Sequence, residues 1–191
     1  MLALTEPTAG VPLYQLKITL RDSRPPIWRR IIVPANIKLS RLHYVLQSVM
    51  PWTNSHLHLF EADGACYGDL TMGVDPETLD EKRHTLAAIA AGTNSTFVYE
   101  YDFGDGWEHI VVVEKVLPVD STFKRAVCLA GKNACPPDDC GGMPGYYEML
   151  KVLANPKDEE HESMKEWLGG EWDAKRFEVE QANANLKRIK I

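Results

Sequence analysis

Apolar and polar residues alternate along several short stretches of the chain, which is the pattern of half-buried β-strands. Residues 14–20 place four apolar side chains on one face and polar side chains on the other. Residues 27–33 repeat the alternation, and Pro34 ends it because proline cannot donate to a strand ladder. Residues 96–103 and 107–116, rich in aromatic and β-branched residues, predict two more strands. We therefore predict a mainly antiparallel sheet built from hairpins.

Helical spacing of apolar residues predicts the elements that cover this sheet. Residues 42–49 form an apolar stripe, with Ser40 as a candidate N-cap and Pro51 as a stop. Beyond the sheet, the spacing and the Gly and Pro punctuation predict three helices, at residues 144–153, 158–168 and 177–189.

These elements together predict an α+β fold. A mainly antiparallel sheet would pack against one N-terminal helix and against a helical C-terminal segment. We expect a single domain over residues 1–191, rich in strands over 13–142 and helical over 143–191.

The two central strands meet at Gly104-Asp105-Gly106, which is typical turn material. A two-residue turn at Asp105-Gly106 would place Asp102 directly opposite His109. A carboxylate beside an imidazole can fix its tautomer or orient it as a metal ligand. The same pair could be an ordinary cross-strand contact on a solvated face.

Two further histidines lie on another predicted strand, in which alternation places His56, His58 and Phe60 on the same face. Two imidazoles at this spacing can bind one metal ion, and a carboxylate such as Asp102 could complete a facial triad. They could equally hydrogen-bond beside the core as neutral imidazoles.

The loop after the central hairpin contains three cysteines, Cys128, Cys135 and Cys140, amid glycine and proline. Thiolates so spaced could bind zinc, which takes four tetrahedral ligands, and His109 on the adjoining strand is the first candidate for the fourth. The alternatives are reduced cysteines that pack as small apolar groups, or a disulfide. Zinc is the only cofactor that the sequence suggests.

Charge is distributed unevenly within the net charge of −6. Residues 1–60 carry seven Lys/Arg and two Asp/Glu, whereas residues 61–191 carry 14 and 25. The N-terminal positive charge is concentrated in four arginines that could contact phosphates of a nucleic acid, or pair with the acidic remainder of the chain. They are Arg21, Arg24, Arg29 and Arg30.

No apolar stretch in the sequence approaches the length of a membrane span, and residues 1–12 lack the pattern of a secretory signal. We therefore expect a soluble, cytoplasmic protein with no membrane partner. A reducing compartment weakens the disulfide alternative.

The chain contains five distinctive motifs: YQLKITL (14–20), PPIWRR (25–30), SHLHLF (55–60), YEYDFGDGWEH (99–109) and ACPPDDCGG (134–142). Together they resemble the motifs of the plasmid pRiA4b ORF-3-like family, and the resemblance extends over residues 13–186. It implies a small α+β domain with no established activity. Some members carry the label TnpR, a resolvase of insertion elements, which would imply DNA recombination. Ser23 is the one serine flanked by arginines, and its context predicts a turn.

Three functions remain compatible with the sequence. The first is a non-catalytic module that binds a partner and is held together at the cysteine loop either by zinc or by packed thiols. The second is a metal-dependent hydrolase that uses the three histidines and Asp102. The third is a nucleic-acid-binding accessory of mobile elements that uses the arginine cluster.

Overall fold

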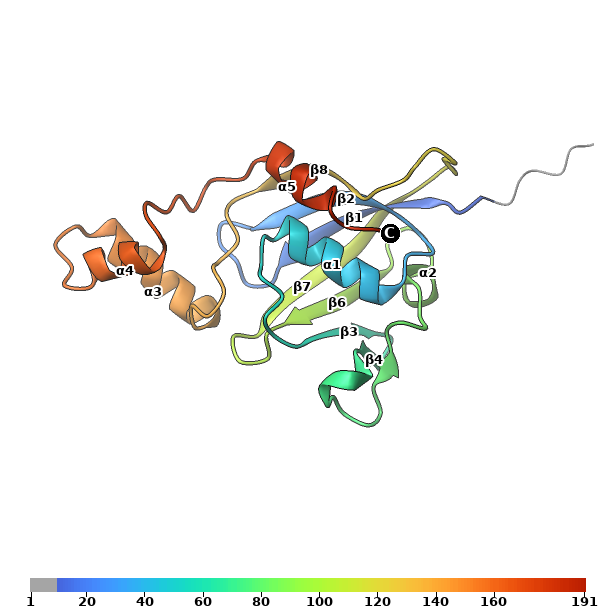
Figure 1. The fold of residues 1–191 in the computed structure, drawn as a ribbon, viewed down its shortest axis with the longest axis horizontal. Coiled ribbons are helices and arrows are strands. Elements are labelled where there is room, and N and C mark those ends of the chain that lie inside the picture. The colour runs from blue at the N-terminus through green and yellow to red at the C-terminus, as the bar shows by residue number, and fades with distance from the viewer. Residues whose placement is uncertain (1–9) are drawn as a thin grey trace, which may run out of the picture.

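The computed structural model describes residues 10–191, and the expectation that the chain lacks a leader concerns mainly residues 1–9, outside the described part. The strands are β1 (Leu13–Leu20), β2 (Trp28–Pro34), β3 (His58–Ala62), β4 (Ala65–Gly68), β5 (Leu79–Asp80), β6 (Thr96–Tyr101), β7 (Trp107–Leu117) and β8 (Val127–Lys132). They form one sheet in the order β5-β4-β3-β6-β7-β1-β2-β8 (Figure 1). All neighbours are antiparallel except β4 and β5. The predicted α+β fold is confirmed.

Helix α1 (Leu39–Val49) covers the face of the sheet that carries the core (Figure 1). The predicted apolar stripe packs onto the inward residues of the strands. Burial of each such side chain stabilises the fold by about 2 kcal/mol. No side chain caps the helix, which starts directly after Lys38, so the predicted cap at Ser40 is wrong. The stripe consists of Leu42, Val45, Leu46 and Val49, all at most 1% exposed.

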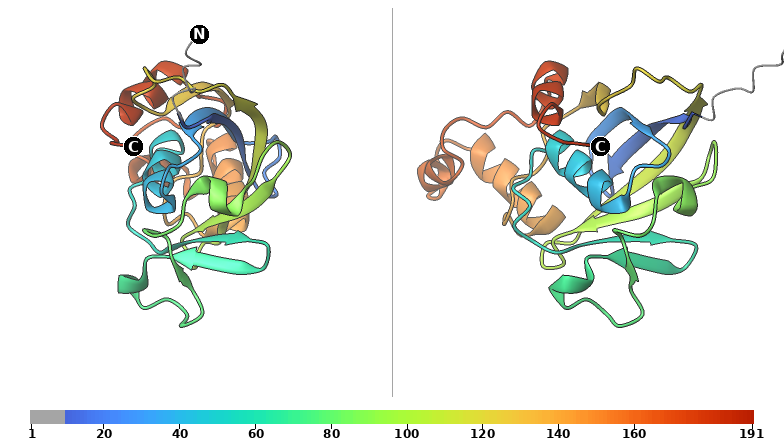
Figure 2. Two further views of the ribbon diagram at one scale, coloured as in Figure 1. Left: turned by 90° about the vertical axis from the view of Figure 1, so that its right-hand side faces the viewer. Right: turned by 45° about the vertical axis from the view of Figure 1, so that its right-hand side comes forward.

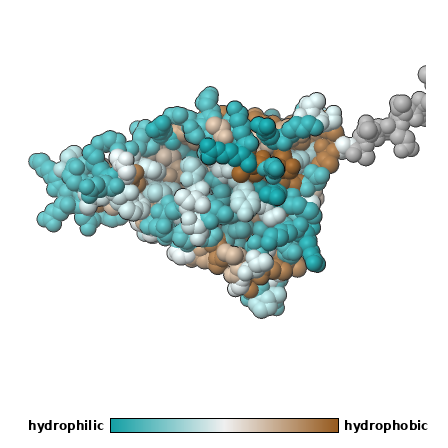
Figure 3. Space-filling model, in the orientation of Figure 1, coloured by the Kyte–Doolittle hydropathy of each residue, from teal (hydrophilic) through white to brown (hydrophobic). Residues whose placement is uncertain are grey.

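The remaining helices connect strands or follow the sheet. They are α2 (Leu86–Ile89), α3 (Gly142–Ala154), α4 (His161–Trp167) and α5 (Val179–Leu186), with a short 3-10 turn η1 (Leu70–Met72). Helices α3 and α4 lie beyond one end of the sheet, whereas α5 returns beside α1 and β8 (Figures 1 and 2). The end formed by α3 and α4 has a largely hydrophilic surface (Figure 3). Within residues 10–191, every helix is too short or too polar to cross a bilayer.

The opposite face of the sheet carries an ion pair between Arg30 and Glu114. Because of this pair, we expect the free energy of unfolding to depend on pH. Glu114 accepts hydrogen bonds from Arg30 Nε and Nη2, at 2.6 and 2.8 Å, and another from Gln15. The bonds from Arg30, supported by Gln15, lower the pKa of Glu114 to about 2. Because the folded-state pKa is depressed, this stabilisation is complete above the ordinary pKa near 4.5 and is lost as the pH falls toward 2.

We therefore expect Glu114→Gln to reduce the free energy of unfolding by about 1 kcal/mol at pH 7 and by almost nothing at pH 2. Urea denaturation at the two pH values measures the difference. Glu148→Gln is the control, because the pair between Glu148 and Lys151 is exposed on α3. An equal cost of Glu114→Gln at both pH values would contradict the expectation.

Candidate metal centre

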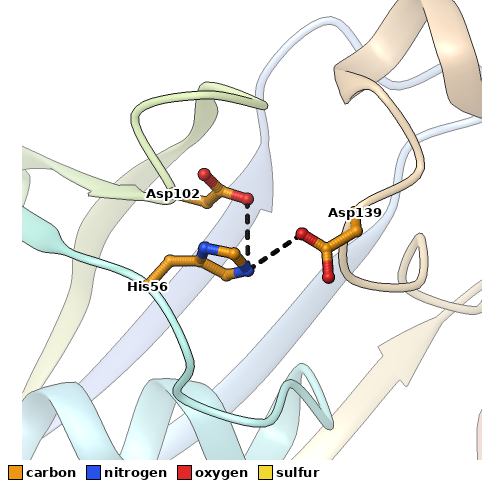
Figure 4. Close-up of side chains that lie close together, drawn as sticks. All are labelled: His56, Asp102 and Asp139. Carbon is orange, nitrogen blue, oxygen red and sulfur yellow. Dashed lines mark ion pairs between the residues drawn. The ribbon is translucent and has the colours of Figure 1, made fainter.

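Three potential metal ligands converge where the β6–β7 turn meets the loop after β8 (Figure 4). Nε2 of His56 lies 3.6 Å from Oδ2 of Asp102 and 3.1 Å from Oδ1 of Asp139. All three ligand atoms lie within 4.8 Å of one another, and this is the one such group of three within residues 10–191. The side chains come from three segments that are far apart in sequence.

Asp102 follows the last residue of β6 and has a left-handed backbone, with φ of 58°. Aspartate tolerates this conformation better than most residues because its side chain can bond to the nearby backbone. Its Oδ1 accepts hydrogen bonds from the amides of Gly104 and Asp105, at 3.0 and 3.4 Å. The turn therefore holds one carboxylate oxygen and leaves Oδ2 directed toward His56.

The predicted pairing of Asp102 with His109 is wrong. Tyr101 pairs with Trp107 and Tyr99 with His109, so a five-residue loop, 102–106, replaces the predicted two-residue turn. His109 consequently lies on the core face, fully buried, and its Nδ1 lies 3.0 Å from the carbonyl oxygen of Tyr99. Its Nε2 has no hydrogen-bond partner within the described chain.

Asp139 is presented by the loop that contains the cysteines. Its backbone is also left-handed, with φ of 59°, and its side chain is 71% exposed. The loop is tied to the β6–β7 turn because Oδ2 of Asp105 accepts a hydrogen bond from the amide of Gly141 at 3.1 Å. At Gly142, a Cβ would lie 2.5 Å from the carbonyl oxygen of Asp105, so only glycine permits this approach. These contacts fix Asp139 relative to Asp102.

His56 lies before β3 rather than on it, held between the two loops. Its Nε2 is buried and makes no hydrogen bond within residues 10–191, although it lies at ion-pair distance from both carboxylates. Beside it, the hydroxyl of Tyr101 accepts a hydrogen bond from the amide of Ser55 at 3.1 Å. Burial raises the pKa of Tyr101 to about 12, so the phenol is neutral at physiological pH.

The two distances from Nε2 of His56 are close to the edges of a coordination polyhedron. Ligand atoms that lie about 2.1 Å from a metal ion are about 3.0 Å apart in an octahedron and about 3.4 Å apart in a tetrahedron. The separations from His56 to the two aspartates, 3.1 and 3.6 Å, fall near these values. One imidazole and two carboxylates suit a divalent ion such as Zn²⁺ or Mn²⁺.

His58 does not join this group, contrary to the prediction that it shares a face with His56. β3 begins at His58, so strand alternation does not extend back to His56. Nε2 of His58 lies 2.7 Å from Oε2 of the buried Glu81, and its ring stacks on His43 at 3.5 Å between centroids. His58 therefore belongs to a buried polar network in the core.

The predicted zinc site of three cysteines and His109 is also not assembled within the described residues. The buried guanidinium of Arg29 lies near the thiols of Cys128 and Cys135, and a second cation in the same space would be repelled. Burial raises the pKa of Cys128, of Cys135 and, to about 12, of Cys140, so the thiols are neutral. All three are free cysteines, which corresponds to the alternative of packed thiols.

The four arginines do not form one basic surface. Arg29 is 1% exposed and lies in the core, because β2 turns every second side chain inward. Arg21 pairs with Glu108 and Arg30 with Glu114, while Arg24 is exposed in a loop. Ser23 has the predicted turn role, since its Oγ donates to the carbonyl of Leu20 and accepts from the amide of Ile27.

Asp139 is the site residue that sequence reasoning missed. It belongs to the motif Cys135-Pro-Pro-Asp-Asp-Cys140, in which the cysteines drew attention to zinc. Two consecutive aspartates after two prolines are a signal for a rigid loop that presents a carboxylate. The neighbouring Asp138 has the supporting role, since its Oδ2 accepts hydrogen bonds from the amide and hydroxyl of Thr53.

Comparisons with known proteins cover both the sheet and this site. The family profile described as "Plasmid pRiA4b ORF-3-like protein" matches residues 12–181. The uncharacterised protein y4hQ of Sinorhizobium fredii is 40% identical over 175 residues, or 90% of this chain and 89% of the relative. The crystal structure of the protein of unknown function MM3350 from Methanosarcina mazei Go1 has a TM-score of 0.81 and 36% identity. That similarity covers 91% of this chain and 97% of the other.

Proposed function

This chain belongs to the plasmid pRiA4b ORF-3-like family, and we propose that it binds a divalent metal ion through His56, Asp102 and Asp139 and uses that ion for hydrolysis. The observation that carries most weight is Nε2 of His56, which is buried, makes no hydrogen bond to residues 10–191 and faces two carboxylate oxygens. A buried polar atom without a partner costs about 1–3 kcal/mol. A metal ion would supply the missing partner.

Three protein ligands leave coordination positions open for water or substrate, which distinguishes a catalytic from a closed structural site. Asp139 is largely exposed, so the ion would be reachable from solvent. Asp139 also lines a cavity of about 330 Å³ between its loop and helices α3 and α4, whose other walls include Met149, Met164 and Trp167. Asp139 is the one proposed ligand that lines this cavity, so a substrate would extend from the cavity past Asp139 to the metal, which would polarise it and lower the pKa of bound water.

We expect Asp102→Asn to weaken metal binding by about 100-fold, because an amide oxygen is a poor substitute for a carboxylate on a divalent ion. Asparagine tolerates the left-handed backbone and can still accept a hydrogen bond from the amide of Gly104, so the fold should persist. Calorimetric titration of Zn²⁺ and Mn²⁺ into the chelator-treated chain measures the change.

Asp63→Asn is the matched control, because Asp63 is an exposed aspartate with φ of 50° on the β3–β4 turn. It should bind metal as the parent chain does. Equal affinity of the Asp102 variant and the parent would remove this residue from the site.

Hydrolysis is tested separately with p-nitrophenyl acetate and p-nitrophenyl phosphate. Turnover should require added metal and should disappear in Asp102→Asn but not in Asp63→Asn. Metal binding without any metal-dependent turnover would favour the alternative, a binding module that does no chemistry.

A further inference from the structure

A second cavity, lined by none of the proposed metal ligands, lies between the end of α1, the cysteine loop and the segment that leads into α5. Its volume is about 310 Å³, near the lower limit for small-molecule sites. Helix α5 packs beside α1 here (Figure 1). The walls of the cavity therefore come from elements that are far apart in the sequence. The side chains that determine its chemistry are Arg29, Trp172 and Phe177.

Arg29 supplies a buried positive charge at this cavity. Its Nε donates to the carbonyl of Val49 at 2.9 Å, and its Nη1 donates to those of Trp28 and Lys132 at 2.9 and 3.1 Å. Among residues 10–191, no carboxylate lies within 4.0 Å of its guanidinium, and its Nη2 has no hydrogen-bond partner there. A buried charge without a counter-charge is costly, and carbonyl dipoles compensate it only in part.

Two aromatic residues complete the walls. The ring of Phe177 lies over the guanidinium, with its centroid 4.0 Å from Cζ of Arg29. Nε1 of Trp172 is buried and has no hydrogen-bond acceptor in the described chain. The cavity therefore combines a cation, an unused N–H donor and flat apolar surfaces, which are the elements of a site for an anion with an apolar body.

Acidic residues around the cavity limit the charge of that anion. Glu171 pairs with Lys165 at 2.6 Å, and Glu178 pairs with Arg176 at 3.0 Å. Asp173 also lines the cavity, and within residues 10–191 its carboxylate accepts one hydrogen bond, from the amide of Lys175. These carboxylates would repel a dianion more strongly than a monoanion.

We propose that this cavity binds a small monocarboxylate, whose carboxylate pairs with Arg29 and whose apolar body lies against Phe177 and Trp172. Nothing in this inference depends on the metal centre, which is built from other residues.

Calorimetric titration of the full chain with 3-phenylpropionate, indole-3-acetate and butyrate tests the proposal. Each is compared with the alcohol of the same carbon skeleton, which keeps the shape but removes the charge. At least one carboxylate should bind about tenfold or more tightly than its alcohol, because a charge-assisted hydrogen bond to a buried guanidinium is lost. Phenyl phosphate, with a charge near −2, should bind more weakly than 3-phenylpropionate.

Variants at Ser48, which lines the cavity on α1, establish the location. Ser48→Phe should fill the cavity and abolish binding, whereas Ser48→Ala, which removes only a hydroxyl that bonds to the carbonyl of Tyr44, should leave it unchanged. Circular dichroism verifies that both variants are folded. The proposal is overturned if no carboxylate binds, if each alcohol binds as tightly as its carboxylate, or if Ser48→Phe binds normally.

Discussion

Between pH 6.5 and pH 5, the free energy of unfolding should fall by about 3 kcal/mol in total. Two buried histidines are responsible. Burial, assisted by the neighbouring His58, lowers the pKa of His43 to about 3, and burial lowers the pKa of His109 to about 4. Both are therefore neutral in the folded chain, while the unfolded chain takes up protons below its ordinary pKa of 6.5. The slope for each histidine is about half of 1.4 kcal/mol per pH unit at pH 6.5 and approaches the full value near pH 5.

The sign follows from the direction of the shifts. A depressed histidine pKa gives stability that is complete above 6.5 and is lost as the pH falls toward the folded-state value. Urea denaturation in steps from pH 7 to pH 5 measures the slope. The window ends above the range in which Glu114 contributes.

His109→Asn should halve that slope. Asparagine cannot titrate, and its Nδ2 can donate to the carbonyl of Tyr99, near which Nδ1 of the histidine lies. At neutral pH the variant loses the ring's packing against Trp52 and Tyr99, whose ring centroids are 5.1 and 5.4 Å away. An unchanged slope in the variant would show that His109 is not the source of the acid sensitivity.

Alternation along single strands predicted most of the sheet, because a half-buried strand must place apolar residues on one side. Arg29 shows where two lines of sequence reasoning conflicted. In the alternation of residues 27–33, Arg29 falls on the same side as Ile27, Ile31 and Val33, which indicates an inward side chain. Its proximity in sequence to other arginines suggested instead a basic surface. The phase was the better guide, since a strand cannot turn one side chain outward without a bulge.

The register of the central hairpin could not be predicted from the turn motif alone. Asp105-Gly106 is typical of a two-residue turn, but Asp102 adopts a left-handed backbone and caps the loop amides itself. The better signal was the phase of Trp107 and His109, which places both inward opposite Tyr101 and Tyr99. Because His109 shares the phase of the apolar Trp107, this alternation would have indicated that its imidazole points into the core.

The candidate metal centre was harder to predict because its geometry is not local. His56, Asp102 and Asp139 approach one another only because β3 pairs with β6 and because two loops interlock at the end of the sheet. No periodicity relates loop residues across such distances in sequence. The contact between Gly142 and Asp105, which holds the loops together, is possible because glycine has no side chain.

Arg29→Met should lower the free energy of unfolding by about 3 kcal/mol, although methionine is apolar and fills a similar space. Three buried carbonyls, of Trp28, Val49 and Lys132, would lose their donors, at about 1 kcal/mol each. Contact with Phe177 would also weaken. The gain from no longer burying a charge offsets part of this cost, which is why the expected loss is not larger.

Arg30→Met is the matched control, since Arg30 is the next residue of β2 but points to the opposite, solvated face. It should cost about 1 kcal/mol, because it breaks one partly exposed pair with Glu114. Urea denaturation at pH 7 compares the two variants with the parent chain. If Arg29→Met is as stable as the parent, the guanidinium is dispensable for folding. Ligand binding would then be the remaining explanation for a buried arginine without a counter-charge.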